Sequence, residues 1–186
     1  MTVEISSAKA DARGAWVIRE FVAAQDAASL GELDTAIETR SAYGVRPTPD
    51  GLLVGEAALP GPVEKRFDID LQAVPIEKGW VAVQDGRVRG FVGMSVEPWN
   101  MRLAIWHLYV DRAYRRQGAG HLLMAAAISW GRKSGATSAW IETSNLNAPG
   151  IRAYVALGFQ ICGFDTSLYR STASQSEFAV FMSREL

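Results

Sequence analysis

An apolar run that ends in a basic, glycine-rich turn most constrains how this chain can fold. The run is Leu108-Tyr109-Val110-Asp111-Arg112-Ala113-Tyr114-Arg115-Arg116-Gln117-Gly118-Ala119-Gly120-His121. Its first residues favour a strand, and a helix is expected to begin near Gly120. Because Gly118 and Gly120 lack a Cβ, backbone N–H groups can converge on an anion there, and the helix N-terminus adds free amides. The pattern predicts a phosphate-binding turn, with charge supplied by Arg115 and Arg116.

The turn does not match the common nucleotide-binding motifs. It lacks the eight-residue loop ending in Gly-Lys-Ser/Thr and the Gly-x-Gly-x-x-Gly spacing of dinucleotide folds. A second pattern downstream narrows the choice of ligand, because Asn147 is followed by Gly150, Tyr154, Gly158 and Phe159. Asparagine is favoured before the first residue of a helix and glycine just past its end. We therefore expect a helix between Asn147 and Gly158.

Together the two segments resemble the GNAT superfamily of acyl-CoA-dependent N-acyltransferases. The family signature Arg/Gln-x-x-Gly-x-Gly/Ala is matched by Arg115, Gly118 and Gly120, and the second signature by Asn147 through Phe159. The resemblance implies acetyl-CoA as co-substrate and no metal. It implies that acetyl-CoA is bound by Leu108, Tyr109, Val110, Arg115, Arg116, Gln117, Gly118, Ala119, Gly120, His121, Asn147, Gly150 and Tyr154.

The fold expected is of the α/β (α+β) class, with a mixed, mainly antiparallel central sheet flanked by helices and an added N-terminal β-hairpin. We expect one domain over residues 1–186, with a variable part at 1–78 and an acetyl-CoA-binding core at 79–186. Turn and strand signals predict two hairpins. These are Ser41–Val45 with Leu52–Leu59, and Gly79–Gln84 with Arg87–Val96 around Asp85-Gly86.

Further elements follow from the same signals. A third strand is expected at about Met101–Val110, and the helix after the turn should carry Leu123, Ala127 and Trp130 on one face and stop near Ser134-Gly135. Residues 16–21 mix apolar and charged side chains and are compatible with either a strand or a helix. The last strands are expected at Ala139–Glu142, Phe159–Phe164 and Glu177–Met182.

Acyl transfer from a thioester to an amine needs a neutral amine, a stabilised oxyanion and a protonated leaving thiolate. His107 is the best-placed base, with Glu97 and Glu142 as rivals, and a structural histidine is the alternative interpretation. The resemblance implies that the Leu108 N–H polarises the thioester carbonyl and that Tyr154 protonates the coenzyme A sulfur. Without the motif, Tyr154 would read as a core aromatic residue.

Further residues resemble the streptothricin acetyltransferase-like branch, whose members use acetyl-CoA to acetylate the β-lysyl amine of that antibiotic and inactivate it. The branch usually carries an acidic pair where this chain has Trp106-His107, which suggests a different or less charged amine. The substrate-binding residues expected are Glu97, Trp99, Trp106, Glu142 and Asp165. A protein or peptide N-acetyltransferase and a non-catalytic acyl-CoA-binding module remain as alternatives.

Composition sets the remaining expectations. A formal net charge of −1 disfavours a nucleic-acid partner, and the single cysteine, Cys162, excludes an internal disulfide and is expected to be a buried, inert thiol. No apolar run suits a membrane span, and residues 1–14 are too polar for a signal peptide. We expect a soluble, cytoplasmic monomer or homodimer whose partners are acetyl-CoA and a small-molecule amine.

Overall fold

The structure, a computed structural model, describes residues 14–186, which form two compact units. Of these residues, 14–35, 67–140 and 185–186 make up unit 1, and 36–66 and 141–184 make up unit 2. Residues 1–13, with most of the segment considered for a signal peptide, lie outside the described part. The expectation of a single domain over residues 1–186 stays a prediction.

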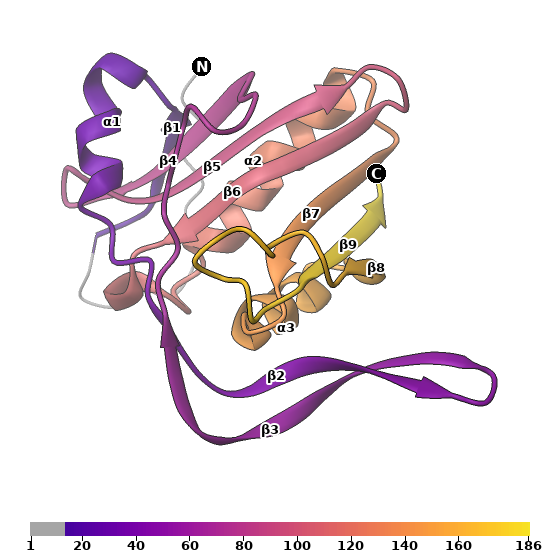
Figure 1. Cartoon of the computed structure of the whole chain (residues 1–186). Coiled ribbons are helices and arrows are strands. Elements are labelled where there is room, and N and C mark those ends of the chain that lie inside the picture. Colours follow the sequence, from indigo (N-terminus) through magenta and orange to yellow (C-terminus); the bar gives the residue numbers. More distant parts are fainter. Residues whose placement is uncertain (1–13) are drawn as a thin grey trace. The chain divides into compact units, whose positions relative to one another are not determined.

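Unit 1 contains four antiparallel strands, in the order β1 (Val17–Glu20), β4 (Lys78–Gln84), β5 (Arg87–Glu97) and β6 (Arg102–Val110) (Figure 1). The predicted hairpin of β4 and β5 and the predicted third strand are confirmed. The turn at Asp85-Gly86 has φ of +51° and +71°, which is the left-handed geometry that matches strand twist. Strand β1 lies where the sequence was compatible with either state.

The helices of unit 1 are α1 (Ala23–Gly31), the short 3₁₀ helix η1 (Arg112–Tyr114) and α2 (Ala119–Lys133). Helix α2 follows the glycine-rich turn as expected and ends before Gly135, whose φ is +85°. It buries Leu123, Met124, Ala127, Ile128 and Gly131. Trp130 lies at the margin of this face, half-buried, with its ring centroid 6.4 Å from that of Trp80 on β4.

Unit 2 contains the predicted N-terminal hairpin, β2 (Ile37–Thr48) with β3 (Gly51–Lys65), which forms a two-stranded sheet of its own (Figure 1). Both strands run further than the sequence indicated, because pairing continues past the register shift between Thr39 and Ser41. The turn is reduced to Pro49-Asp50. The added hairpin is therefore confirmed, with longer strands.

The rest of unit 2 contains α3 (Ala148–Ala156) and strands in the order β7 (Ser138–Ser144), β9 (Ala179–Glu185) and β8 (Gln160–Asp165). The first three residues of β7 belong to unit 1. These three strands and the helix occupy the segments that the sequence predicted for them. Their order makes β8 the last strand on this side.

The prediction that Cys162 is a buried thiol is wrong, because the side chain is exposed. Ile161 pairs with Met182 and Gly163 pairs with Phe181, so the register shifts between them and leaves Cys162 as the extra residue of a bulge. A bulged residue on the last strand of a sheet has no facing partner to cover it. An apolar neighbourhood in the sequence could not reveal this irregularity.

Candidate active site

The turn between β6 and α2 has the backbone geometry that an anion site needs. Arg116 and Gly118 have positive φ, +61° and +91°, and Gly118 stands at the N-cap of α2. The Leu122 N–H donates to the Gly118 carbonyl at 3.1 Å, which closes the first turn of the helix. The N–H groups of residues 119–121 precede it and point along the helix axis toward the turn. The predicted phosphate-binding turn thus has free amides and a positive helix end.

The space at this turn also suits a bound phosphate. A Cβ added at Gly118 would meet no atom within 4 Å, and one at Gly120 would meet only Val110, at 3.7 Å. Gly118 is therefore required by its backbone conformation, whereas nothing in the protein itself demands glycine at position 120. The residues present fit the pyrophosphate of acetyl-CoA, because the turn offers amides over open space.

The Arg115 guanidinium hydrogen-bonds to two backbone carbonyls beside the turn. Its Nε donates to the Val110 carbonyl at 2.9 Å and its Nη2 to the Asp34 carbonyl at 3.1 Å, and the Arg112 N–H donates to Asp34 as well, at 2.9 Å. Burial is the main cause of a lowered pKa for Arg115. The guanidinium was expected to supply charge to the turn. It also donates to the carbonyl of Val110, which is a predicted cofactor-binding residue.

A second set of contacts to the turn comes from residues that the sequence analysis did not single out. The Trp16 Nε1 donates to the Gln117 carbonyl at 2.8 Å, and its ring meets that of Tyr114 edge to face at 6.3 Å. The Arg89 guanidinium covers the same Tyr114 ring, 4.3 Å from its centroid. These contacts join residues far apart in the sequence, so no local pattern could have found them.

A bulge in β6 separates the predicted substrate and catalytic residues. His107 pairs with Gly93 and Ile105 with Met94, which leaves Trp106 as the extra residue. The Trp106 Nε1 donates to the Ser95 Oγ at 2.8 Å. Bulges re-aim side chains next to active sites, and this one lies directly before the candidate base.

His107 is 7% exposed, and its Nε2 lies 3.1 Å from the Asp70 carbonyl. A carbonyl can only accept, so Nε2 carries the proton and Nδ1 keeps a lone pair. Within residues 14–186, Nδ1 is a buried atom with no hydrogen-bond partner. Burial lowers the pKa of His107, so the ring is neutral near pH 7. The geometry is compatible with both interpretations from the sequence, because Nε2 has a backbone partner and Nδ1 keeps a lone pair, and the role of His107 as base stays a prediction.

The neighbours of His107 include further predicted residues. Leu108, Tyr109 and Val110 follow it as half-buried residues, and the Tyr109 ring centroid lies 5.8 Å from that of His107.

Two predicted substrate-binding residues lie at or after the end of β5. Trp99 is 79% exposed, and Glu97 is half-buried and stands opposite Arg102 in the strand register. Neither Glu97 nor Trp99 is therefore buried.

In unit 2, Asn147 caps α3 as the sequence predicted. Its Oδ1 accepts from the Gly150 N–H at 3.1 Å, and its Nδ2 donates to the Thr143 Oγ1 at 2.9 Å. A Cβ at Gly150 would lie 2.6 Å from both Cγ and Oδ1 of Asn147. The spacing of asparagine and glycine in the motif therefore has a structural reason, which is room for the capping amide.

Tyr154 lies on α3 and is 8% exposed, with its ring centroid 6.3 Å from that of Phe159. Gly158 ends the helix with a φ of +86°, and the Arg184 Nη1 donates to the Leu157 carbonyl at 2.5 Å. The helix and both its ends match the prediction. The buried ring is compatible with the core interpretation and with an acid held in one orientation.

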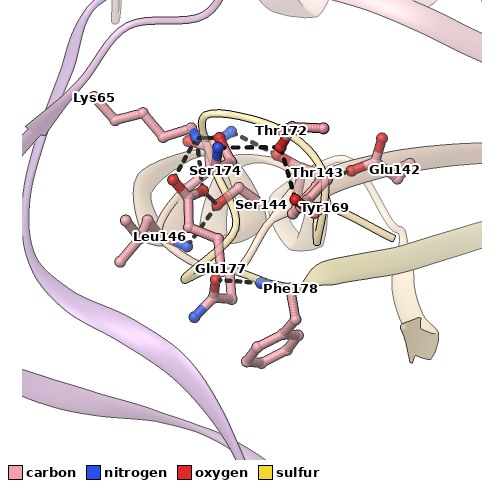
Figure 2. A network of polar contacts seen from close by, with 12 residues as sticks. Lys65, Glu142, Thr143, Ser144, Leu146, Tyr169, Thr172, Ser174, Glu177 and Phe178 are labelled. Carbon is pink, nitrogen blue, oxygen red and sulfur yellow. Dashed lines mark hydrogen bonds and ion pairs between the residues drawn. The ribbon is translucent and has the colours of Figure 1, made fainter. Parts of the chain in front are cut away.

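The two remaining predicted residues, Glu142 and Asp165, differ in their surroundings. Tyr169 donates its hydroxyl to the Glu142 Oε1 (Figure 2), and burial is the main cause of a raised pKa for Glu142. Asp165 accepts from the N–H and hydroxyl of Ser167 at 2.7 and 2.6 Å, and these bonds lower its pKa. Tyr169 is a residue that sequence reasoning did not place at the site.

Residues 14–186 also bear on metal binding and membrane insertion. No group of three or more histidine, cysteine, aspartate or glutamate side chains in this part of the chain could hold a metal ion. In the same residues, no helix has the length and apolar character needed to cross a membrane.

The strand, turn and helix of unit 1 and the capped helix of unit 2 define an acyl-CoA-dependent acyltransferase. The sequence model of the Acetyltransferase (GNAT) family matches residues 53–159, which is more than half of the chain. The protein therefore belongs to the GNAT family and is an acetyl-CoA-dependent N-acetyltransferase. The predicted fold, enzyme class and co-substrate are confirmed.

Its relatives include streptothricin acetyltransferases. That of Streptomyces lavendulae is 36% identical over 168 residues, covering 85% of this chain and 89% of the relative. The crystal structure of a nourseothricin acetyltransferase is 37% identical with a TM-score of 0.83, covering 91% of this chain and 98% of the other. A putative streptothricin acetyltransferase from Bacillus anthracis str. Ames, in complex with acetyl coenzyme A, shares the fold at 23% identity and a TM-score of 0.79, over 92% and 100% of the two chains.

Proposed function

We propose that this N-acetyltransferase moves the acetyl group to a primary amine of a small molecule, and that a streptothricin-like or other aminated antibiotic is such an acceptor. The observation that carries the proposal is the 36% identity with the Streptomyces lavendulae enzyme, which extends over nearly the whole of both chains. Similarity fixes the acyl donor better than the acceptor. Antibiotic resistance is therefore part of the proposal.

The residues of unit 1 would bind the donor and start the reaction. The amides of residues 118–121 would hold the pyrophosphate, with Arg116 and Gln117 beside them, and the Val110 N–H would hold the pantetheine arm. The Leu108 N–H would stabilise the oxyanion, which is typically worth about 3 kcal/mol in the transition state. His107 would accept, at its Nδ1 lone pair, the proton that the neutral amine loses as its nitrogen attacks the thioester carbonyl, since Nδ1 has no hydrogen-bond partner in residues 14–186.

The residues of unit 2 would complete the transfer. We assign to Tyr154 the role of the acid that protonates the departing thiolate, and to Asn147 a contact with pantetheine in addition to its cap. The amine would attack the thioester directly in a ternary complex, so that no acetyl group is carried by the protein. One catalytic domain over residues 1–186 stays part of the proposal.

The residues proposed to bind the acceptor include two, Trp106 and His107, that differ from those usual in the streptothricin acetyltransferase-like branch. Trp106 and His107 replace an acidic pair, so the reacting amine would meet an aromatic ring and a neutral imidazole rather than two carboxylates. Glu97, Trp99, Glu142 and Asp165 remain candidates for contacts with the rest of the acceptor. Among them, Glu142 is half-buried, and burial raises its pKa.

The test is acetyl-CoA turnover, measured by release of the free thiol, with streptothricin, aminoglycosides, polyamines, lysine derivatives and short peptides as acceptors. Calorimetric binding of acetyl-CoA runs alongside. Turnover with one class of small amine supports the proposal and names the acceptor type. Turnover with peptides alone would instead establish a peptide N-acetyltransferase. Binding without turnover on any amine would contradict the proposed acceptors.

The localisation and the oligomeric state of the enzyme are also part of the proposal. We propose a cytoplasmic enzyme whose partners are acetyl-CoA and a small-molecule amine, with no nucleic acid or membrane partner. A monomer or homodimer is expected, and sedimentation of the purified chain distinguishes the two.

A further inference from the structure

The connection between β3 and β4 runs against the core of unit 1 without forming a helix or a strand. It spans residues 66–77, of which residues 67–77 belong to unit 1 and are called here the strap. At one end, the Thr35 Oγ1 donates to the Phe67 carbonyl at 2.5 Å. At the other, the Glu77 N–H donates to the Met94 carbonyl at 2.9 Å. The strap is therefore bonded to the rest of unit 1 at both ends.

Apolar side chains hold the middle of the strap, on either side of Asp70. Ile69 and Leu71 are half-buried, and both pack against the buried cluster of unit 1, whereas Asp70 is exposed. The members of that cluster are Leu30, Leu33, Val81, Val88 and Phe91. Because both of its neighbours contact the core, the backbone at Asp70 lies close to the strands beneath it.

The Asp70 side chain closes a turn that fixes the direction of its own carbonyl. Its Oδ1 accepts from the Gln72 N–H at 2.9 Å and from the Ala73 N–H at 3.2 Å. Aspartate and asparagine favour this kind of turn, in which the side chain bonds to the backbone two residues on. The ring of atoms closed by the Gln72 bond passes through the carbonyl carbon of Asp70. The turn therefore holds that carbonyl in one orientation.

The same carbonyl is the hydrogen-bond partner of His107. Its oxygen lies 3.1 Å from Nε2, and within residues 14–186 Nδ1 is buried without a partner. The rings of Phe91 and Tyr109 lie beside the imidazole, with centroids 6.2 and 5.8 Å away, and give it no strong acceptor. The bond that one ring nitrogen of a histidine makes decides which nitrogen carries the proton. Here that bond comes from the strap.

We propose that Asp70 is a positioning residue, whose turn keeps the His107 proton on Nε2 and leaves the Nδ1 lone pair for the proton of the attacking amine. This inference rests on the proposed function, in which His107 is the base, and deepens it. Asp70 acts through His107 rather than by contact with either substrate. The turn needs the side-chain oxygen of Asp70 and not its charge, so asparagine should replace it.

The kinetic test compares two variants of Asp70, with streptothricin as acceptor or, if another amine of the panel reacts faster, with that amine. Asp70→Ala removes the turn and should lower kcat about 10-fold, within the range that a general base contributes, with KM for acetyl-CoA unchanged. Asp70→Asn forms the same turn and should restore kcat. Asp68→Ala is the matched control, because it removes a carboxylate from an exposed position two residues earlier in the strap and should leave kcat unchanged.

A second measurement follows the imidazole itself and needs no turnover. The ¹⁵N NMR signals of a histidine ring distinguish its two neutral tautomers, and the chain has only one other histidine, His121, whose signals remain in His107→Gln. The wild-type protein should carry the proton on Nε2. In Asp70→Ala the tautomer ratio should move toward Nδ1 by about 2- to 10-fold, the value of one hydrogen bond, and Asp70→Asn should match the wild type.

A proton on Nδ1 in the wild-type protein, or an unchanged tautomer ratio in Asp70→Ala, would overturn the inference. An Asp70→Asn variant as slow as Asp70→Ala would overturn it too, because the charge and not the turn would then matter. Should Asp70→Ala fail to fold, Asp70→Ser takes its place, since a serine hydroxyl closes the turn more weakly. Full turnover in His107→Gln would count against the proposed base instead, and the tautomer ratio then tests the role of the turn alone.

Discussion

Replacing Gly150 by alanine should destabilise the protein although Gly150 lies in a helix, where alanine is ordinarily the better residue. The new Cβ would lie 2.6 Å from the Cγ of Asn147, so the capping amide must leave its position. The protein then loses the bond to the Gly150 N–H, worth about 1 kcal/mol as a helix cap. It also loses the buried bond to Thr143, whose partners cost about 1–3 kcal/mol when left unsatisfied.

Alanine regains about 0.8 kcal/mol of helix propensity, so the net loss for Gly150→Ala should be about 2 kcal/mol. In a protein that already carries Asn147→Ala the clash is gone, and the same substitution should be neutral or stabilising by about 0.5–1 kcal/mol. The two changes should therefore be strongly non-additive. Urea unfolding of the four proteins of this double-mutant cycle measures the effect. Additive losses would refute the explanation that Gly150 makes room for Asn147.

Three further substitutions test the catalytic and cofactor roles. Tyr154→Phe should lower kcat by about 10- to 100-fold with acetyl-CoA affinity unchanged, and full turnover would exclude Tyr154 as the acid. Because burial lowers the pKa of His107, kcat/KM should show a further decline below about pH 6.5, in addition to the one caused by protonation of the acceptor amine. His107→Gln should lose this further decline, and an unchanged profile would exclude His107 as the base. Gly118→Ala should lower thermal stability and acetyl-CoA affinity through its φ of +91°, whereas Gly120→Ala should weaken binding alone; equal stability losses would contradict this.

The elements that the sequence predicted well depend on short-range chemistry. The turn at Asp85-Gly86, the cap at Asn147 and the glycine turn before α2 each need residues with special backbone or hydrogen-bonding properties. Those properties are carried by one to four consecutive residues, so they can be recognised without the fold. The roles of Leu108 and Tyr154 were taken from the resemblance to the family, and they stay predictions.

Other features came from contacts between distant parts of the chain. Strand β1 forms by pairing with β4, although its own residues are compatible with either a strand or a helix. Cys162 is exposed because a bulge on β8 leaves it without a facing residue. The hydrogen bond from Trp16 to Gln117 joins residues that are 101 positions apart. No periodicity or spacing in the sequence encodes such pairings.

The sequence by itself determined the donor side of this enzyme, since free amides at a glycine turn and a capped helix are local consequences of residue type. Tertiary structure decided what the polar side chains do. It directed the Arg115 guanidinium to carbonyls, tied the His107 Nε2 to Asp70, and brought Tyr169 to Glu142. The physical reason is that a side chain's hydrogen-bond partner, and with it the group's pKa and charge state, depends on burial and on distant neighbours that only the folded chain supplies.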